Sequence, residues 1–279
     1  MNTNIKYKDS VFSFLFSNPD ALRELYSALE GVSLPPDIPV NINTLSDVLY
    51  MDQINDISFT IDNRLVVLIE HQSTINYNMP LRLLIYIARV YEKIVERKKL
   101  YQKNLEKIPE PEFIVLYNGK LPYPDRAVLR LSEAFIDAAG LKPNSSGIPA
   151  LELAVQVYNI NKGHNTELFE KSKTLGGYSA FVGKIREYEK TMSREEAMKA
   201  AIKHCIDNNI LKPFFETHSS EVFNMLITEW STEEAKEVWY EEGRVEGRVE
   251  GRVEGIHYIL DMMNQGLSAE EIKQRLEKA

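Results

Sequence analysis

Two carboxylates in the first third of the chain have the types and spacing needed to hold a metal ion, and one amide lies two positions beyond the second of them. Asp56 opens the segment DISFTIDNRLVVLIEHQ, and Glu70 and Gln72 close it. Carboxylate and amide oxygens are the ligands that hard divalent cations prefer in proteins. These residue types therefore indicate a site for one hard divalent cation, provided that the fold brings the two acids to the same place.

The segment between the two acids has the pattern of a β-hairpin. Residues 57–61 alternate between apolar and polar side chains, and residues 65–69 are a continuous apolar run. The first pattern is typical of a half-buried strand and the second of a fully buried one. Residues 62–64, Asp-Asn-Arg, supply the turn. The sequence thus predicts two antiparallel strands.

The length of the turn decides whether the acids meet. If the loop consists of three residues, Ile61 pairs with Leu65 and Asp56 falls opposite Glu70, with Cβ atoms roughly 4.5–5.5 Å apart. Gln72 then shares the face of Glu70, because side chains alternate along a strand. A two-residue loop would shift the pairing by one and place the acids on opposite faces.

Asp56 followed by Glu70-His71-Gln72 resembles the D…(D/E)xK signature of the PD-(D/E)XK nuclease superfamily. It is more similar to the Rpn branch, the recombination-promoting nucleases, in which ExQ replaces ExK. The resemblance covers nearly the whole chain. Its other parts are YKDSVF from Tyr7 to Phe12, Leu15-Phe16, the region of Tyr86, PEFIVLYNG from Pro111 to Gly119, and the EEGRVEG tail.

This resemblance implies a metal-dependent DNA endonuclease of restriction-endonuclease-like fold, linked to recombination or mobile elements. Asp56 and Glu70 would bind Mg²⁺ or Mn²⁺, and Gln72 would orient the attacking water. Gln72 stands where Lys is usual in the superfamily. Either the metal ion then provides more of the stabilisation of the transition state, or another basic residue takes the place of the Lys. The alternative is a non-catalytic relative that binds DNA or a protein. A three-carboxylate transposase fits poorly, because no third acid with suitable spacing is apparent.

Asp9 is the candidate for an accessory acid, since a carboxylate on the first helix sometimes joins the site in this superfamily. It begins an expected helix over residues 9–30, which Asn18-Pro19 interrupts and Gly31 ends. The structural alternative is that Asp9 is simply the N-cap of this helix.

A second helix is expected from Met79 to about Lys103. Its apolar stripe is assigned to Leu84, Ile87, Ala88, Tyr91, Ile94 and Val95. The opposite face carries Arg82, Tyr86, Arg89 and Lys93. Arg82 and Arg89 are therefore candidate DNA contacts, although a merely solvated face that points away from the hairpin is the other interpretation.

The order of elements predicts an α/β fold with an αβββαβ mixed sheet and a helical C-terminal region. Residues 113–117 form a buried strand, which a right-handed crossover places parallel to the Glu70 strand. Residues 152–160 form a further strand, and residues 127–139 a helix. We expect a nuclease-like domain over residues 1–160, a helical region over 161–240, and a repeat with a terminal helix over 241–279.

The repeat EGRVEGRVEGRVEG, residues 242–255, has a period of four residues. On one helix this spacing sets Arg four residues from Arg and Glu four from Glu, and such like-charge pairs are destabilising. A second copy would set the Arg stripe against the Glu stripe, which predicts a homo-oligomer. A flexible spacer is the alternative.

Composition limits the other possibilities. The 279-residue chain has a net charge of −8 and a pI near 5.3, which argues against indiscriminate coating of nucleic acid. Cys205 is its single cysteine, so no internal disulfide forms. The N-terminus has no apolar signal region, and no apolar run is long enough to span a bilayer. These features predict a cytoplasmic protein.

Overall fold

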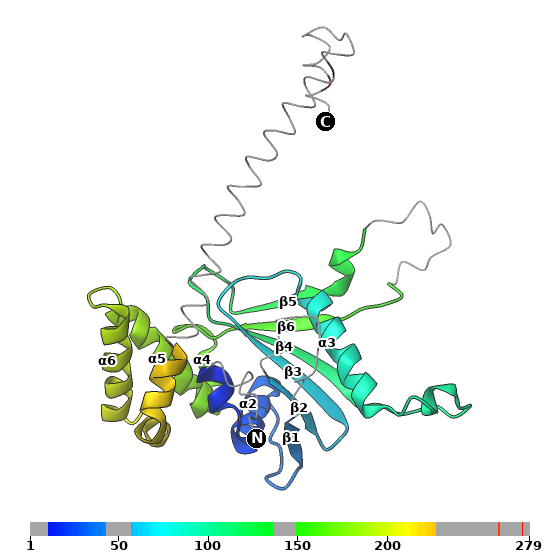
Figure 1. The fold of residues 1–279 in the computed structure, drawn as a ribbon, viewed down its shortest axis with the longest axis horizontal. Helices are drawn as coiled ribbons and strands as arrows, with labels where there is room; N and C mark the ends of the chain where they lie inside the picture. The colour runs from blue at the N-terminus through cyan, green and yellow to red at the C-terminus, as the bar shows by residue number, and fades with distance from the viewer. Residues whose placement is uncertain (1–10, 43–56, 137–148, 227–261, 263–274, 276–279) are drawn as a thin grey trace. The chain divides into compact units, whose positions relative to one another are not determined.

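A six-stranded mixed sheet organises the fold in a computed structural model of the protein (Figure 1), which describes residues 11–42, 57–136, 149–226, 262 and 275. The strand order is β1-β2-β3-β4-β6-β5. The strands are β1 (Val40–Ile42), β2 (Ile57–Ile61), β3 (Leu65–Gln72), β4 (Glu110–Tyr117), β5 (Arg126–Arg130) and β6 (Ala154–Asn159). Strands β3, β4 and β6 run parallel, and the other neighbours pair antiparallel.

Helices cover both faces of this sheet. The helices are α1 (Val11–Leu15), α2 (Pro19–Glu30), α3 (Met79–Ile94), α4 (Thr166–Lys171), α5 (Lys173–Tyr188) and α6 (Arg194–Asp207), with 3₁₀ turns η1 (Lys99–Tyr101) and η2 (Leu131–Ala134). Residues 212–226 are also helical. Helix α3 packs on one face of the sheet and α2 lies on the other (Figure 1). This arrangement confirms the predicted restriction-endonuclease-like α/β core with a helical C-terminal region.

The hairpin has the three-residue loop, which is the first of the two alternatives that the sequence leaves open. Ile61 pairs with Leu65, and the antiparallel register continues to Ile57 opposite Ile69. Asp62 and Asn63 both adopt a φ of 51°, in the left-handed region that Asn and Asp tolerate better than most residues. The local turn chemistry therefore fixes which side chains of β2 share a face with those of β3.

Helix α3 differs from the prediction in its length and in the face that it buries. It ends at Ile94, because Val95 is extended. Its buried side chains are Met79, Pro80, Leu83, Tyr86, Ile87 and Val90, whereas Ala88 and Ile94 of the predicted stripe are exposed. Apolar residues occur around most of this helix, so the predicted stripe and the one next to it are similarly apolar. Packing on the sheet buries the stripe that contains Tyr86.

The helix predicted over residues 127–139 is wrong in its first part, which is strand β5. Arg126–Arg130 pairs antiparallel with β6 at one edge of the sheet, and η2 follows it. Ala127 and Leu129 pack against the core while their neighbours are more exposed. This period-two alternation is the signature of a half-buried strand, and it outweighs the helical propensity of the individual residues.

Other predicted elements are confirmed. The break at Asn18-Pro19 separates α1 from α2, and Gly31 ends α2 with a φ of 67°. The predicted strand over residues 152–160 is β6, which runs parallel to β4. Ser193 and Glu196 form a capping box at the start of α6. Cys205 on that helix is buried, and burial raises the pKa of its thiol to about 12.

The chain divides into two compact units, residues 1–226 and 227–279, and the described residues belong to the first apart from Met262 and Arg275. The repeat over residues 242–255 lies outside the described residues, so its self-association stays a prediction, as does the three-part domain division. Among the described residues, no helix combines the length and apolarity needed to cross a membrane.

Candidate active site

Glu70 and Gln72 lie on the same face of β3, and both point toward α3. Only 3% of Glu70 and 9% of Gln72 is exposed. Each side chain contacts the first turn of α3, Glu70 through Arg82 and Gln72 through Met79. The alternation of side chains along β3 thus places both predicted residues at one site, as the hairpin register requires.

Arg82 forms an ion pair with Glu70 in this site. The guanidinium Nη2 lies 3.2 Å from Oε2 of Glu70 and also donates to the Tyr86 hydroxyl at 3.2 Å. Its Nη1 lies 3.3 Å from the sulfur of Met79. The carboxylate side chain is 5% exposed and the Arg side chain 20% exposed, so the pair is largely shielded from water.

This pair corrects the prediction that the basic face of the helix is solvated and points away from the hairpin. Arg82 and Tyr86 face the sheet, because α3 is rotated relative to the predicted stripe. Arg89 does lie on the exposed face, where it pairs with Glu92 at 2.7 Å. Its contact with DNA stays a prediction. The sequence signal for Arg82 was its spacing of four residues from Tyr86, which puts both on one helix face.

Gln72 is held by two contacts at the end of β3. Its side-chain Nε2 lies 2.6 Å from the sulfur of Met79. Its backbone carbonyl accepts a hydrogen bond from the N–H of Asn118 at 2.8 Å, just after the parallel strand β4. The amide plane is therefore restrained by α3, and the strand end by β4.

Asp56 and Asp9 lie outside the described residues. The register of the hairpin ends at Ile57 opposite Ile69, directly before the pair that would contain Asp56 and Glu70. Within the described residues, no group of three or more His, Cys, Asp or Glu side chains could hold a metal ion. The roles of Asp56 as a metal ligand and of Asp9 as an accessory acid stay predictions.

His71 points to the other face of β3. Its ring stacks on Phe12 with the centroids 4.8 Å apart, and its Nε2 lies 3.1 Å from the hydroxyl of Tyr178. Burial, and secondarily the positive charge of Arg186, lowers the pKa of this imidazole to about 4. The ring is therefore neutral near pH 7 and belongs to the packing of α1 and α5 on the sheet.

The depressed pKa of His71 predicts that the protein loses stability in mild acid. The folded state holds the imidazole neutral down to about pH 4, whereas the unfolded chain takes up a proton near pH 6.5. The free energy of unfolding is thus expected to fall as the pH drops from 6.5 to 4, by at most about 3 kcal/mol from this group.

Urea unfolding of the wild type and of His71→Phe at several pH values measures this effect. Phe keeps the stacking on Phe12 but takes up no proton. The variant should therefore show a smaller loss of stability between pH 6.5 and 4. An equal pH dependence in both proteins would contradict a buried neutral His71.

Comparison with known proteins gives one match. Residues 42–177 match the model of the family described as putative transposase, YhgA-like, which confirms the resemblance to the Rpn family. The match contains β2, β3, α3, β4, β5 and β6, and therefore every described residue of the site. Searches of curated proteins and of solved structures found no match to this chain.

Proposed function

Because residues 42–177 belong to the YhgA-like transposase family, we propose that this protein is a metal-dependent DNA endonuclease that acts in recombination or on mobile elements. The family's description refers to transposition, which requires cutting and joining of DNA strands. Hydrolysis of phosphodiester bonds is the step of that process for which Glu70 and Gln72 supply suitable chemistry.

The observation that carries this proposal is a buried carboxylate at the end of β3. Burying an ionised carboxylate is costly unless it is paired or binds a metal. Glu70 is buried there beside Gln72, and the guanidinium of Arg82 lies 3.2 Å from the carboxylate of Glu70. Such a concentration of charge in a shielded place is typical of functional sites.

The donor atoms fit a hard cation. Glu70 offers carboxylate oxygens and Gln72 an amide oxygen, and Asp56 would supply the second carboxylate if the strand register continues by one residue. When bound, Mg²⁺ or Mn²⁺ would supply activation of a water molecule and neutralisation of phosphate charge.

Arg82 is the residue that we assign to the role of the missing Lys. Gln72 brings no charge, whereas Arg82 places a permanent positive charge beside the carboxylate of Glu70. Its planar fork of N–H donors matches phosphate as well as carboxylate geometry. Arg82 can therefore bind the scissile phosphate while Gln72 orients the attacking water through its amide.

The second candidate function is a non-catalytic nuclease relative that binds DNA or a protein. The ion pair itself favours it, because Arg82 already neutralises the charge of Glu70 without a metal ion. In that case the pair would hold α3 on the sheet and would have no chemical role.

Plasmid nicking by the purified protein in Mg²⁺, Mn²⁺ or EDTA tests the proposal. Conversion of supercoiled plasmid to open circles is expected with either metal and not with EDTA. Asp56→Ala, purified in the same way, is the control for a contaminating nuclease and should be inactive. Activity that survives EDTA or the Asp56→Ala change would overturn the proposal, and inactivity of the wild type would favour the non-catalytic relative.

A further inference from the structure

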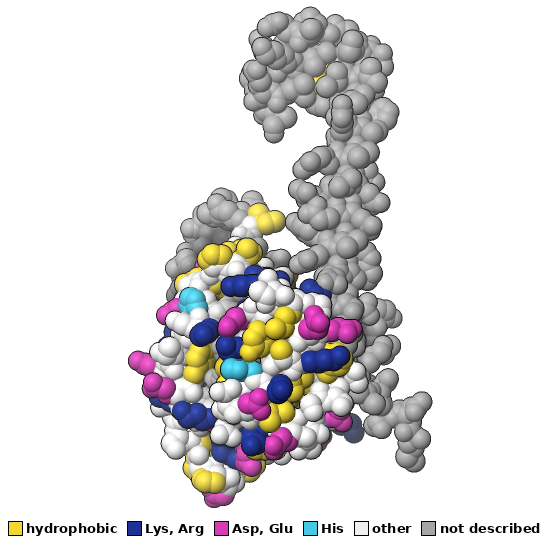
Figure 2. Space-filling view, turned by 90° about the vertical axis from the view of Figure 1, so that its left-hand side faces the viewer, with side chains coloured by type: hydrophobic (Ala, Val, Ile, Leu, Met, Phe, Trp, Pro, Cys, Tyr) yellow, Lys and Arg dark blue, Asp and Glu magenta, His cyan; other side chains and the backbone are white. Residues whose placement is uncertain are grey.

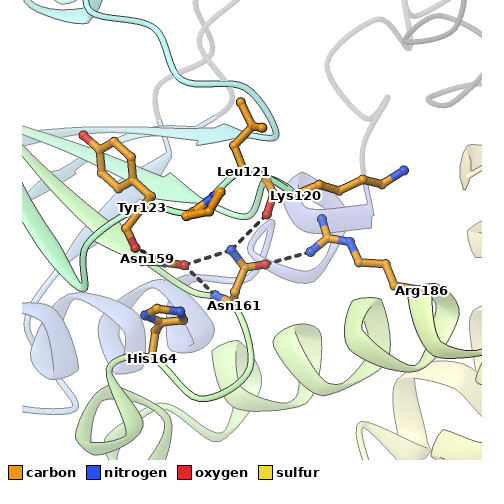
Figure 3. A pocket seen from close by; sticks show the side chains of 9 residues that line it. Lys120, Leu121, Tyr123, Asn159, Asn161, His164 and Arg186 are labelled. Atoms are coloured by element: carbon orange, nitrogen blue, oxygen red, sulfur yellow. Dashed lines mark hydrogen bonds between the residues drawn. The ribbon is translucent and has the colours of Figure 1, made fainter.

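A hollow of about 410 Å³ opens beyond the carboxyl ends of β4 and β6 (Figure 3). Ligands of α/β proteins commonly bind at this edge of the parallel strands. Segments that are distant in the sequence meet here. The lining residues are Gly119, Lys120, Leu121, Pro122, Tyr123, Asn159, Asn161, His164 and Arg186.

Arg186 is fixed in this hollow by the ends of two strands. One guanidinium nitrogen donates to Oδ1 of Asn161 at 2.7 Å, and the other donates to the carbonyl of Asn118. Asn161 is itself held, since its Nδ2 donates to the carbonyl of Gly119 at 3.1 Å (Figure 3). The cation is thus oriented before any ligand arrives, which lowers the entropy cost of binding.

An adjoining hollow of about 650 Å³ extends this cationic surface. It shares Lys120 and Arg186 with the first hollow and adds Lys190 and Arg194. Its one carboxylate, that of Glu189, pairs with Arg194 at 3.2 Å.

Lys120 and Lys190 are the exposed cations of the two hollows. In the described part of the chain, no carboxylate lies within 4.0 Å of either ammonium group. Asp125 lies 2.6 Å from the ring of His164, which lines the first hollow. The two hollows are therefore positive within a chain whose net charge is −8.

This charge is not a general property of the surface. Figure 2 shows a face on which basic and acidic side chains are interspersed, with apolar side chains between them. A concave region lined by one sign of charge focuses the electrostatic field and attracts ions of the opposite sign more strongly than a mixed surface.

We propose that the two hollows bind a phosphate group of the DNA backbone next to the bond that is cut. The oriented guanidinium and two ammonium groups fit a phosphodiester, which is a compact anion that accepts several hydrogen bonds. The hollow adjoins the proposed active site through Asn118. The N–H of Asn118 donates to the carbonyl of Gln72, and the carbonyl of Asn118 accepts a hydrogen bond from Arg186. One DNA strand passing the end of β3 can contact both places. The identity of the ligand as DNA rests on the proposed function.

Fluorescence anisotropy of a labelled DNA duplex in EDTA tests this inference without cleavage. Lys120→Gln combined with Lys190→Gln is expected to weaken binding by about five- to tenfold at 0.1 M salt. The slope of log K against log salt should fall by about 1, because the loss of one phosphate contact removes about 0.9. Lys199→Gln combined with Lys203→Gln makes the same change of charge at two exposed positions of α6 and should leave both quantities unchanged.

Unchanged affinity and slope in the double variant would overturn the phosphate site. That result leaves the nuclease proposal standing, since nicking by the wild type tests it separately. Titration with inorganic phosphate distinguishes a free anion from DNA. If phosphate releases the DNA only at concentrations at which a control salt of equal ionic strength also releases it, the site takes a phosphate of the DNA backbone in preference to the free anion, which supports the proposal. If the protein binds inorganic phosphate but does not bind DNA, the proposal that the hollows bind the DNA backbone is overturned.

Discussion

Replacing Glu70 by Gln is expected to lower metal-dependent plasmid nicking by about 10²–10³-fold, the usual cost of removing one group that stabilises a transition state. Gln has the shape of Glu but carries no charge, and it is a weak ligand for Mg²⁺. The side chain of Glu70 is almost completely buried, so an acid on the protein surface cannot replace it in the site.

Loss of folding must be separated from loss of chemistry in this experiment. Removing the charge of Glu70 leaves Arg82 in a shielded site without its carboxylate, and breaking a buried pair costs about 3–5 kcal/mol. Thermal unfolding should therefore show a lower Tm for Glu70→Gln. Adding Arg82→Met to this variant removes the stranded charge and should recover most of the Tm without recovering nicking.

Arg82 variants decide between the two candidate functions. Arg82→Lys keeps the positive charge and should retain more activity than Arg82→Met, which keeps only the apolar stem. If the Glu70→Gln, Arg82→Met double variant nicks DNA at the wild-type rate, the pair is structural and the site is not catalytic.

Gly119→Ala is expected to cost about 3 kcal/mol or more of the free energy of unfolding. A Cβ at this position would lie 2.2 Å from the carbonyl oxygen of Ser73 and 2.3 Å from the hydroxyl of Tyr117. Both neighbours are restrained, the first as backbone and the second by a hydrogen bond to the carbonyl of Leu121. The ends of β3 and β4 would have to separate, and overpacking of this kind is destabilising.

Gly183→Ala is the matched control for this substitution. Gly183 lies inside α5, and a Cβ there meets nothing within 4 Å. The change should stabilise the protein by about 0.5–1 kcal/mol, because Ala favours a helix interior over Gly. Urea unfolding of the two variants beside the wild type measures both effects. A Gly119→Ala variant as stable as the wild type would show that the strand ends are not closely packed at this point.

Local patterns in the sequence were sufficient for the sheet around the site. The alternation over residues 57–61, the apolar run that follows, and the turn residues Asp62 and Asn63 predicted the hairpin of β2 and β3 and limited its register to two alternatives, of which the structure has the one with a three-residue loop. The long crossover predicted that β4 is parallel to β3. The hairpin depends on side-chain period and turn geometry within about twenty residues, and the crossover on a long helical segment between two apolar runs, so both can be read from the chain alone.

The strand β5 shows where such local patterns mislead. Residues 126–130 alternate over only five positions, and all but the first of them lie in the segment 127–139 that the sequence predicts as a helix. Pairing with β6, some 25 to 30 positions later in the chain, decided the conformation. Short segments take their structure from the partner that they find, and the partner is not visible in the segment itself.

The sequence by itself determined that Glu70 and Gln72 share one face of β3, because that follows from a period of two. Only the tertiary structure decided what lies opposite them. The rotation of α3 that pairs Arg82 with Glu70 results from packing among nearly equivalent apolar faces. Arg186 reaches the carbonyl of Asn118 across 68 positions of the chain. Contacts of that kind are fixed by the docking of whole helices on the sheet, and no local pattern of residues specifies them.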